Sequence, residues 1–361
     1  SDTAPFGDKI LGFTIFSGYY LVFFLIINYD FARYDLTRFF QVTICVVIFQ
    51  LAVSIAQKLG IFSIDLPFLP LLLTYDENIG SLSVSRVAGT FGDFELMAEY
   101  SAFIFIILTC LLLYKSVNKI VSYKFLIATI FSLLILVLLT GTRSSLMLIG
   151  VAFGILFITH LRILFSYRLW LTIVIAYFSF SFMVKHGDPL GLQLVFDRIA
   201  EIDLSGKGNQ TSDEVINRDL TFQFAYDRIE EESWIIGKGY TTGEGYRKSL
   251  FGTQTQTAEI RDYHSLYLSM PIFFGWIGSF ILILLFFGSL FFYANNMLRA
   301  SKGSFAFYFS LGLLLSWLML FVNEYKIQFI RYPNYFFLIW FWIAISINLS
   351  QKFSNEDHYS R

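Results

Sequence analysis

Residues 125–164 read FLIATIFSLLILVLLTGTRSSLMLIGVAFGILFITHLRIL. Two apolar runs, 125–140 and 145–164, are separated only by a short turn that contains Arg143. A membrane-spanning α-helix needs about 20 mostly apolar residues, and both runs are close to that length. The stretch therefore predicts two membrane-spanning helices joined by a tight turn, and with them an all-α polytopic integral membrane protein.

The composition of the whole chain agrees with a membrane protein. Of its 361 residues, 56% are hydrophobic and 15% are charged, whereas soluble domains carry about 25% charged residues. The net charge of -1 gives no reason to expect a nucleic acid partner. Cys45 and Cys110 lie in apolar runs, so both are predicted to be small buried hydrophobic residues with neither disulfide nor metal-site spacing.

About nine runs along the chain are apolar and long enough to be membrane spans. They are 10–28, 39–59, 96–114, 125–140, 145–164, 169–184, 266–292, 305–322 and 334–350. The connections after odd-numbered spans, with the C-terminal tail, hold 11 basic residues, whereas the short segments on the other side hold six. Because basic connections stay in the cytoplasm, the N-terminus is predicted to lie outside and the C-terminus inside.

One long polar segment, 185–263, interrupts this pattern and is predicted to lie outside the membrane. It divides the chain into six spans within 1–184, the large loop, three spans within 264–350 and a cytoplasmic tail, 351–361. Residues 214–236 have apolar side chains near one helical face, so the loop is expected to contain a helix. A polar segment of this size in an otherwise membrane-embedded chain is where chemistry is expected.

Arg143 is a candidate anion-binding residue at the outer membrane boundary. Removing an Arg from water is costly unless it faces an anion or a water-filled cavity. Thr142, Ser144 and the free N–H groups at the start of the next helix would add donors for an anion. The alternative is an interfacial Arg whose side chain reaches the lipid headgroups above a Ser/Thr helix cap.

Arg86 precedes a Gly-Thr-Phe-Gly turn, 89–92, and is predicted to lie near the same outer surface. Glu95 and Glu99 follow it and are four residues apart, so they share a helix face. Paired carboxylates can act as acid and base. The alternative is that both solvate the end of the span and pair with a nearby Arg.

His264 stands at the outer start of a predicted span, directly after the large loop. His is the side chain best suited to proton transfer near neutral pH, and the positive charge of nearby Arg261 would favour the neutral imidazole that a base needs. The alternative is an interfacial His that caps a helix. Arg218 and Arg261, taken alone, are ordinary solvated charges of the loop, and the sequence contains neither a zinc-site spacing nor a Walker-type phosphate loop.

Three stretches together resemble the O-antigen polymerase/ligase superfamily of bacterial envelope glycosyltransferases. The first, 140–146 with Gly154, is similar to the family's Thr-Gly-Ser-Arg turn. The second runs from 217–219 to 234–239 and resembles an Arg-led helix that ends in a Pro-Leu-Leu-Gly-x-Gly-like turn, with Trp234 in place of Pro. The third is His264-Ser265 followed by 275–278. A weaker fourth match is Arg86 with 89–92, where Asp93 stands for Asn, and the resemblance covers 80–350.

The resemblance implies a fold like that of the C-type glycosyltransferases. The family has about twelve spans, so the nine visible here imply three further N-terminal helices, in agreement with a chain that does not begin with Met. It also implies a bacterial inner (cytoplasmic) membrane location, with the active site facing the periplasm or outside. The expected partners are undecaprenyl-diphosphate-linked oligosaccharides as donor and acceptor, membrane lipid and, as a further candidate, a chain-length regulator.

The resemblance also implies roles for the candidate residues. His264 would be the catalytic base for the acceptor hydroxyl, and Arg143 and Arg218 would bind the diphosphate, because guanidinium groups bind phosphate oxygens bidentately. Arg86 and Arg261 would be secondary ligands of the diphosphate. Transfer would invert the anomeric centre and would need no cofactor or metal, because Arg supplies the positive charge.

Three functions follow from these expectations. The favoured one is a polysaccharide (O-antigen-type) polymerase, which transfers glycan to another lipid-linked repeat unit in lipopolysaccharide or other polysaccharide biosynthesis. The second is an O-antigen ligase, which transfers glycan to lipid A-core. The third is a lipid-linked oligosaccharide transporter, which would have charged residues within spans, broken helices and inverted repeats. The motifs do not separate the first two functions.

Overall fold

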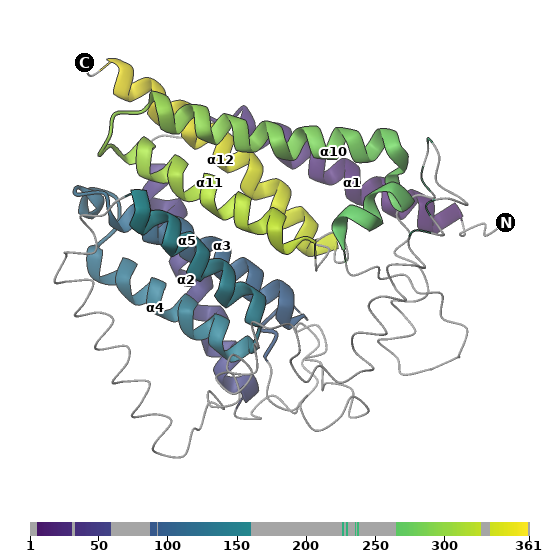
Figure 1. The fold of residues 1–361 in the computed structure, drawn as a ribbon, viewed down its shortest axis with the longest axis horizontal. Helices are drawn as coiled ribbons and strands as arrows, with labels where there is room; N and C mark the ends of the chain where they lie inside the picture. Colours follow the sequence, from purple (N-terminus) through teal and green to yellow (C-terminus); the bar gives the residue numbers. More distant parts are fainter. Residues whose placement is uncertain are drawn as a thin grey trace. The chain divides into compact units, whose positions relative to one another are not determined.

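The computed structural model describes residues 6–30, 33–58, 87–91, 93–159, 265–325 and 333–359, together with Tyr226, Ile229, Ile235 and Gly237. Regular structure in these residues is entirely helical, which confirms the predicted fold class (Figure 1). The helices are α1 (Phe6–Ile27), α2 (Arg33–Lys58), α3 (Phe94–Leu112), the short 3-10 helix η2 (Val117–Lys119), α4 (Tyr123–Thr140), α5 (Arg143–Thr159), α10 (Leu266–Arg299), α11 (Phe305–Asn323) and α12 (Pro333–Tyr359).

Eight of the nine predicted spans coincide with these helices. Within the described residues, five helices are long and apolar enough to cross a membrane, namely α2, α3, α4, α10 and α11, and α1, α5 and α12 contain shorter apolar helical stretches. The predicted span 169–184 lies outside the described residues. Helix α12 continues to Tyr359, through most of the predicted tail, because hydropathy marks only the part of a helix that lies in hydrocarbon.

The chain forms two compact units, each described by itself. The α1/α10/α12 unit contains residues 1–31, 209–300 and 324–361. The α3/α11 unit contains residues 32–208 and 301–323, and therefore also helices α2, α4 and α5.

Helix α3 forms the centre of the α3/α11 unit. It is buried on nearly every side, and it packs against α4, α5 and α11. Close approach of α11 requires Gly312, since a Cβ there would lie 3.0 Å from the Cα of Ile107 and 3.1 Å from the Cβ of Cys110. Next to it, the Ser316 hydroxyl donates to the Phe103 carbonyl at 2.9 Å. Small residues and such hydrogen bonds are the usual means by which helices associate in lipid.

Contacts in the α3/α11 unit give the directions of its helices. Asn323, at the end of α11, binds Glu99 near the start of α3, whereas Tyr114, just after α3, packs on Phe305 at the start of α11. Helices α3 and α11 are therefore antiparallel. The beginning of α2 also meets the beginning of α11, through Phe40 and Phe305. These directions agree with the alternation of spans that the sequence predicts.

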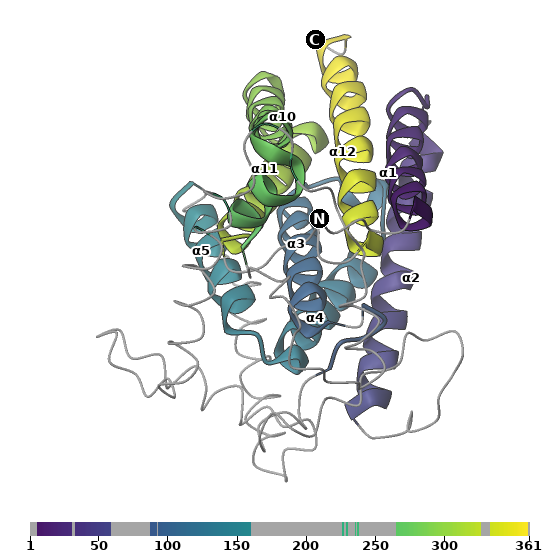
Figure 2. The same ribbon diagram turned by 90° about the vertical axis from the view of Figure 1, so that its right-hand side faces the viewer.

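In the α1/α10/α12 unit, α1 and α12 lie side by side and run in the same direction (Figures 1 and 2). Tyr19 packs on Phe337 and Phe23 packs on Trp340, with ring centroids 5.5 Å and 5.7 Å apart. Further along both helices, the Asn348 side chain contacts the end of α1. Later residues of α1 thus contact later residues of α12, as expected for parallel helices. Parallel packing agrees with the prediction that the first and last visible spans cross the membrane in the same sense.

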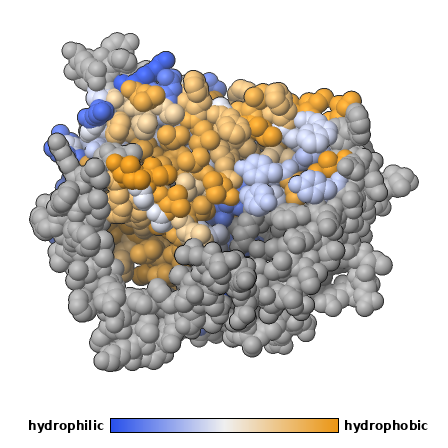
Figure 3. Space-filling model, viewed as in Figure 1, coloured by the Kyte–Doolittle hydropathy of each residue, from blue (hydrophilic) through white to orange (hydrophobic). Residues whose placement is uncertain are grey.

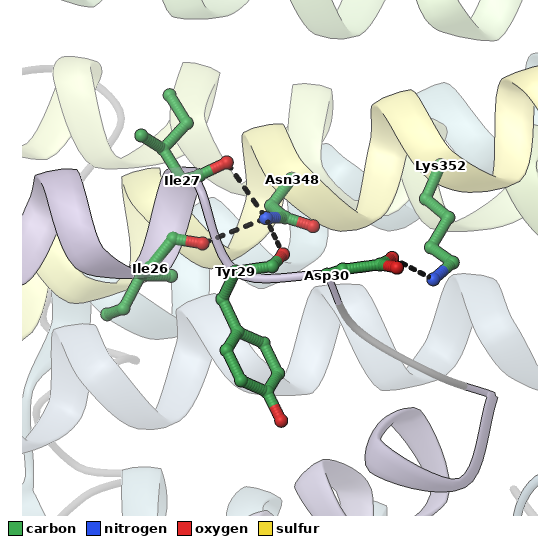
Figure 4. Close-up of polar contacts among 6 residues, drawn as sticks. All are labelled: Ile26, Ile27, Tyr29, Asp30, Asn348 and Lys352. Atoms are coloured by element: carbon green, nitrogen blue, oxygen red, sulfur yellow. Dashed lines mark hydrogen bonds and ion pairs between the residues drawn. The ribbon is translucent and has the colours of Figure 1, made fainter.

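The end of α1 is held by two side chains of α12 (Figure 4). The last carbonyl groups of a helix lack helical partners. Here the Asn348 amide donates to the carbonyls of Ile26, Ile27 and Tyr29 at 2.8, 3.0 and 2.7 Å. One turn further along α12, the Lys352 ammonium pairs with the Asp30 carboxylate at 2.7 Å. These contacts close the helix end and attach it to α12.

Exposed apolar side chains cover the outer faces of several helices, and Figure 3 shows them gathered on one face of the molecule. On α10 they include Trp276, Phe280, Leu284 and Phe287, at helical spacing. Such a stripe is expected where a helix faces lipid. The same effect makes the prediction of a buried Cys45 wrong, because the lipid-facing side of a span is as apolar as its core-facing side. Cys110 is buried, as predicted.

Candidate functional site

The turn between α4 and α5 positions Arg143. Helix α4 ends at Thr140 and Gly141 adopts φ 63°, a left-handed conformation that costs other residues about 1–2 kcal/mol. The Gly141 N–H donates to the Leu138 carbonyl at 3.0 Å, which closes the helix. Helix α5 begins at Arg143, two residues later, so the turn places a partly buried guanidinium side chain in the first turn of α5.

Three hydroxyl groups beside Arg143 are buried. Thr142 and Ser145 are 1% and 0% exposed, and the Ser144 oxygen is also inaccessible to solvent. Within the described part of the chain, none of these three oxygens has a hydrogen-bond partner. A buried polar group in that state costs about 1–3 kcal/mol. With the first N–H groups of α5, which have no helical acceptor, the turn offers a set of donors suited to an anion.

The Gly-Thr-Phe-Gly turn before α3 is held by two glutamines of α2. The Gln57 carbonyl oxygen accepts from the N–H groups of Ala88 and Gly89 at 3.2 and 2.9 Å, and its amide donates to the Gly89 carbonyl at 2.8 Å. The Gln50 carbonyl oxygen accepts from the Thr90 N–H, and the Gln50 amide donates to the Thr90 hydroxyl. Neither glutamine was predicted as a site residue from the sequence, although their spacing of seven in an apolar span places them on one helix face.

Asp93 begins α3 as its N-cap. Its carboxylate accepts from the N–H groups of Glu95 and Leu96 at 2.7 and 3.2 Å. Asn and Asp are equally good N-cap residues, so the replacement of the family's Asn by Asp93 preserves this structural role.

Glu99 is buried deep in the α3/α11 unit. It is 3% exposed and accepts a hydrogen bond from the Asn323 amide. A small cavity beside it is lined by Glu99, Phe103, Leu148 and Ser316, among others. Leu148 lies five residues after Arg143 on α5, which is about 7.5 Å along the helix axis. The prediction that Glu99 solvates the end of the span is therefore wrong, because helix packing turns its carboxylate inward.

Helix α10 begins immediately after His264. Ser265 is its buried N-cap and accepts at its carbonyl from the N–H and hydroxyl of Ser269 at 3.0 and 2.7 Å. The N–H of Leu266 donates to the Glu324 carbonyl at 2.9 Å, a contact outside the regular helix pattern. The residue that follows His264 is thus fixed to the segment that follows α11.

Two of the family-like stretches meet in this unit. Helix α10 is interrupted at Gly275, with φ 66° and ψ -179°, so that its first two turns are separate from the rest. Gly237, from the Gly-rich turn of the large loop, lies against the backbone at this interruption. Both glycine stretches belong to the family-like motifs of the sequence, but their contact was not predicted from it.

Of the five predicted site residues, the structure describes Arg143. Arg86, Arg218, Arg261 and His264 lie outside the described residues, so their roles and their meeting with Arg143 stay predictions. The structure does describe the neighbours of two of them, Val87 and Ser265, and both are buried. Among the residues that the structure describes, no group of three or more His, Cys, Asp or Glu side chains could hold a metal ion.

Comparison with known proteins supports the family resemblance. The family model described as O-antigen ligase matches residues 127–283. This range contains the turn around Arg143, the whole of the polar segment 185–263, and the two glycine stretches that meet at Gly275. A search of curated proteins gave no match. The matched region contains motifs that the sequence resemblance rests on, and it therefore supports the resemblance to the O-antigen polymerase/ligase superfamily.

Proposed function

We propose, from the match of residues 127–283 to the family model described as O-antigen ligase, that the protein is a polysaccharide polymerase of the bacterial inner membrane. It transfers an oligosaccharide from undecaprenyl diphosphate to the sugar of another lipid-linked repeat unit. The active site faces the periplasm, at the outer ends of the spans. The observation that carries this proposal is that Arg143 opens α5 beside three buried hydroxyl groups, those of Thr142, Ser144 and Ser145, that have no partner among the described residues.

The diphosphate of the donor needs cations and hydrogen-bond donors as the glycosidic bond breaks. Arg143 supplies a guanidinium group, which binds phosphate oxygens bidentately. The buried hydroxyls of Thr142, Ser144 and Ser145 and the N–H groups of α5 supply donors that are already in place. Arg218 is the second diphosphate ligand, and Arg86 and Arg261 contribute in a second rank. These side chains supply the positive charge that Mg²⁺ supplies elsewhere, so the transfer is metal-independent.

His264 is the proposed base. It takes the proton of the acceptor hydroxyl while the acceptor oxygen attacks the anomeric carbon from the face opposite the diphosphate. The new glycosidic bond forms as the bond to the diphosphate breaks, which inverts the anomeric centre and releases undecaprenyl diphosphate. The fixed position of Ser265 supports this role, because the covalent chain keeps His264 directly beside a buried, anchored residue.

A ligase is the second candidate, because the matching family model is described as O-antigen ligase. The two functions differ only in the acceptor. Purified protein in lipid vesicles, given lipid-linked repeat units alone, separates them. A polymerase produces a ladder of glycan lengths, and a ligase produces no new product until lipid A-core is added. Unchanged glycan length with both acceptors present would reject both functions and favour a transporter.

A further inference from the structure

Gly237 and Gly275 lie backbone against backbone. A Cβ on Gly237 would lie 2.4 Å from the Gly275 nitrogen and from the Phe273 carbonyl group, and a Cβ on Gly275 would lie 2.4 Å from the Ile235 oxygen. Distances below 3.0 Å essentially never occur for real Cβ atoms. Any side chain at either position would therefore push the loop segment 235–237 away from α10.

Gly275 is required for a second reason. Its φ of 66° with ψ of -179° lies in a backbone region that is essentially restricted to glycine. This conformation separates the first two turns of α10, Leu266 to Phe274, from the remainder of the helix. The contact thus forms at the one point of α10 where the helix is broken.

An apolar contact supports the same docking. Ile272 is buried within this two-turn segment and packs against Ile229 of the large loop, together with Leu268 and Phe273. The segment is therefore held at three points. Glu324 binds the N–H of Leu266 at its start, Ile229 packs on its middle, and Gly237 closes on its end.

In the sequence, the two-turn segment is close to two residues of the proposed site. His264 immediately precedes it, and Arg218 lies 11 residues before Ile229 on the loop side of the contact. We propose that the Gly237–Gly275 contact is a positioning contact of the enzyme, which holds the loop at Ile229 and Gly237 against the start of α10. It acts through His264 and Arg218 and takes no part in the chemistry itself. This inference rests on the proposed function.

Cysteine cross-linking tests the geometry without any activity measurement. The full chain carries Ile229→Cys and Ile272→Cys in a background with Cys45→Ser and Cys110→Ala, and a short bifunctional thiol reagent is added to membranes. We expect an intramolecular cross-link for this pair and at least a tenfold lower yield for Ile229→Cys with Leu284→Cys. Leu284 lies nine residues beyond the break at Gly275, about 13.5 Å along the continuous part of α10. Equal yields for the two pairs would overturn the proposed contact.

Alanine substitutions then test the positioning role. Gly237→Ala is expected to lower both the cross-link yield and the transfer rate, the latter roughly 10- to 100-fold, because a displacement of about 1 Å can cost that much. Gly288→Ala on the same helix is the control, because an added Cβ there meets nothing within 4 Å and the rate should stay within about twofold. A Gly237→Ala variant with unchanged cross-linking and transfer would contradict the proposal.

A third measurement tests the proposal even if the Gly237→Ala variant fails to fold. Cross-linking Ile229→Cys to Ile272→Cys with a cleavable reagent should leave the transfer rate within about twofold of the rate without the cross-link. The reason is that the two segments are already in contact in the working enzyme. Loss of transfer on cross-linking, with recovery on cleavage of the reagent, would overturn the positioning role. If the cross-link forms as expected while the wild type transfers no glycan under any acceptor condition, the proposed function fails and the contact itself stands.

Discussion

At the scale of single residues, the turn around Arg143 combines a charged side chain with three buried hydroxyl groups. Arg143 stands at the first position of α5, and the hydroxyls of Thr142, Ser144 and Ser145 beside it are buried. Each of these buried hydroxyls costs free energy while its hydrogen bonds are unmade, and here three of them lie next to one another beside a cation. A bound anion would satisfy the whole set at once.

Substitution of Arg143 should separate charge from geometry. Arg143→Ala is expected to lower transfer roughly 100-fold or more, and Arg143→Lys should restore only part of it, because an ammonium group cannot bind phosphate bidentately. The measurement is kcat/KM for the lipid-linked donor in vesicles. Arg299→Ala, in the last turn of α10, is a matched control that should stay within about twofold. Equal rates for Arg143→Ala and this control would remove Arg143 from the site.

The Glu99–Asn323 hydrogen bond makes a stability prediction. Asn323→Leu leaves the buried Glu99 carboxylate without its amide donor, so the free energy of unfolding in detergent should fall by about 1–3 kcal/mol. Ser310→Ala on the same helix is the control. The Ser310 hydroxyl is buried and has no partner among the described residues, so its removal should leave stability unchanged or higher. A neutral Asn323→Leu would show that the hydrogen bond is unimportant.

At the scale of helices, hydropathy predicted where eight spans lie but not which faces they bury. Helix α3 is buried nearly all round, whereas α10 exposes Trp276 and Phe280, and both helices are equally apolar in sequence. In a membrane, the lipid and the protein core select the same residue types, so face cannot be read from apolarity. The break at Gly275 was likewise not predicted, since only its φ and ψ distinguish it from other glycines in spans.

Gly312 tests the packing between α3 and α11. Gly312→Val should destabilise the protein by about 1–3 kcal/mol, because the added atoms would collide with the backbone of Ile107. Gly150→Val on α5 serves as the control, since nothing lies within 4 Å of a Cβ built there. Unfolding in detergent gives both values. A Gly312→Val variant as stable as Gly150→Val would mean that the two helices are not in backbone contact.

At the scale of the whole molecule, the distribution of Lys and Arg predicts which end of each span lies in the cytoplasm. The helix directions within each unit agree with the alternation of the spans, which is the same for either orientation. Charge alone could not predict how the candidate site assembles. The proposed site depends on contacts between segments that are distant in the sequence. One described contact beside it, Gly237 on Gly275, joins positions 38 residues apart and is made by backbone atoms. Backbone contacts leave no side-chain pattern except the glycines themselves.

Labelling of single cysteines tests this orientation. Tyr29 and Tyr325 are 53% and 65% exposed, and they follow α1 and α11 respectively. In a background without Cys45 and Cys110, Tyr29→Cys should react with a membrane-impermeant maleimide only from the cytoplasmic side, and Tyr325→Cys only from the outside. Labelling of both positions from the same side would contradict the predicted topology.

The most direct test of the account is glycan transfer by His264→Ala. In vesicles supplied with lipid-linked repeat units, the wild type should produce a ladder of lengths, and His264→Ala should lose transfer by roughly 100-fold or more, because general-base catalysis contributes about 10²–10⁴-fold. His186→Ala, another histidine of the large loop, should keep the wild-type ladder. An undiminished ladder from His264→Ala would contradict the proposed mechanism.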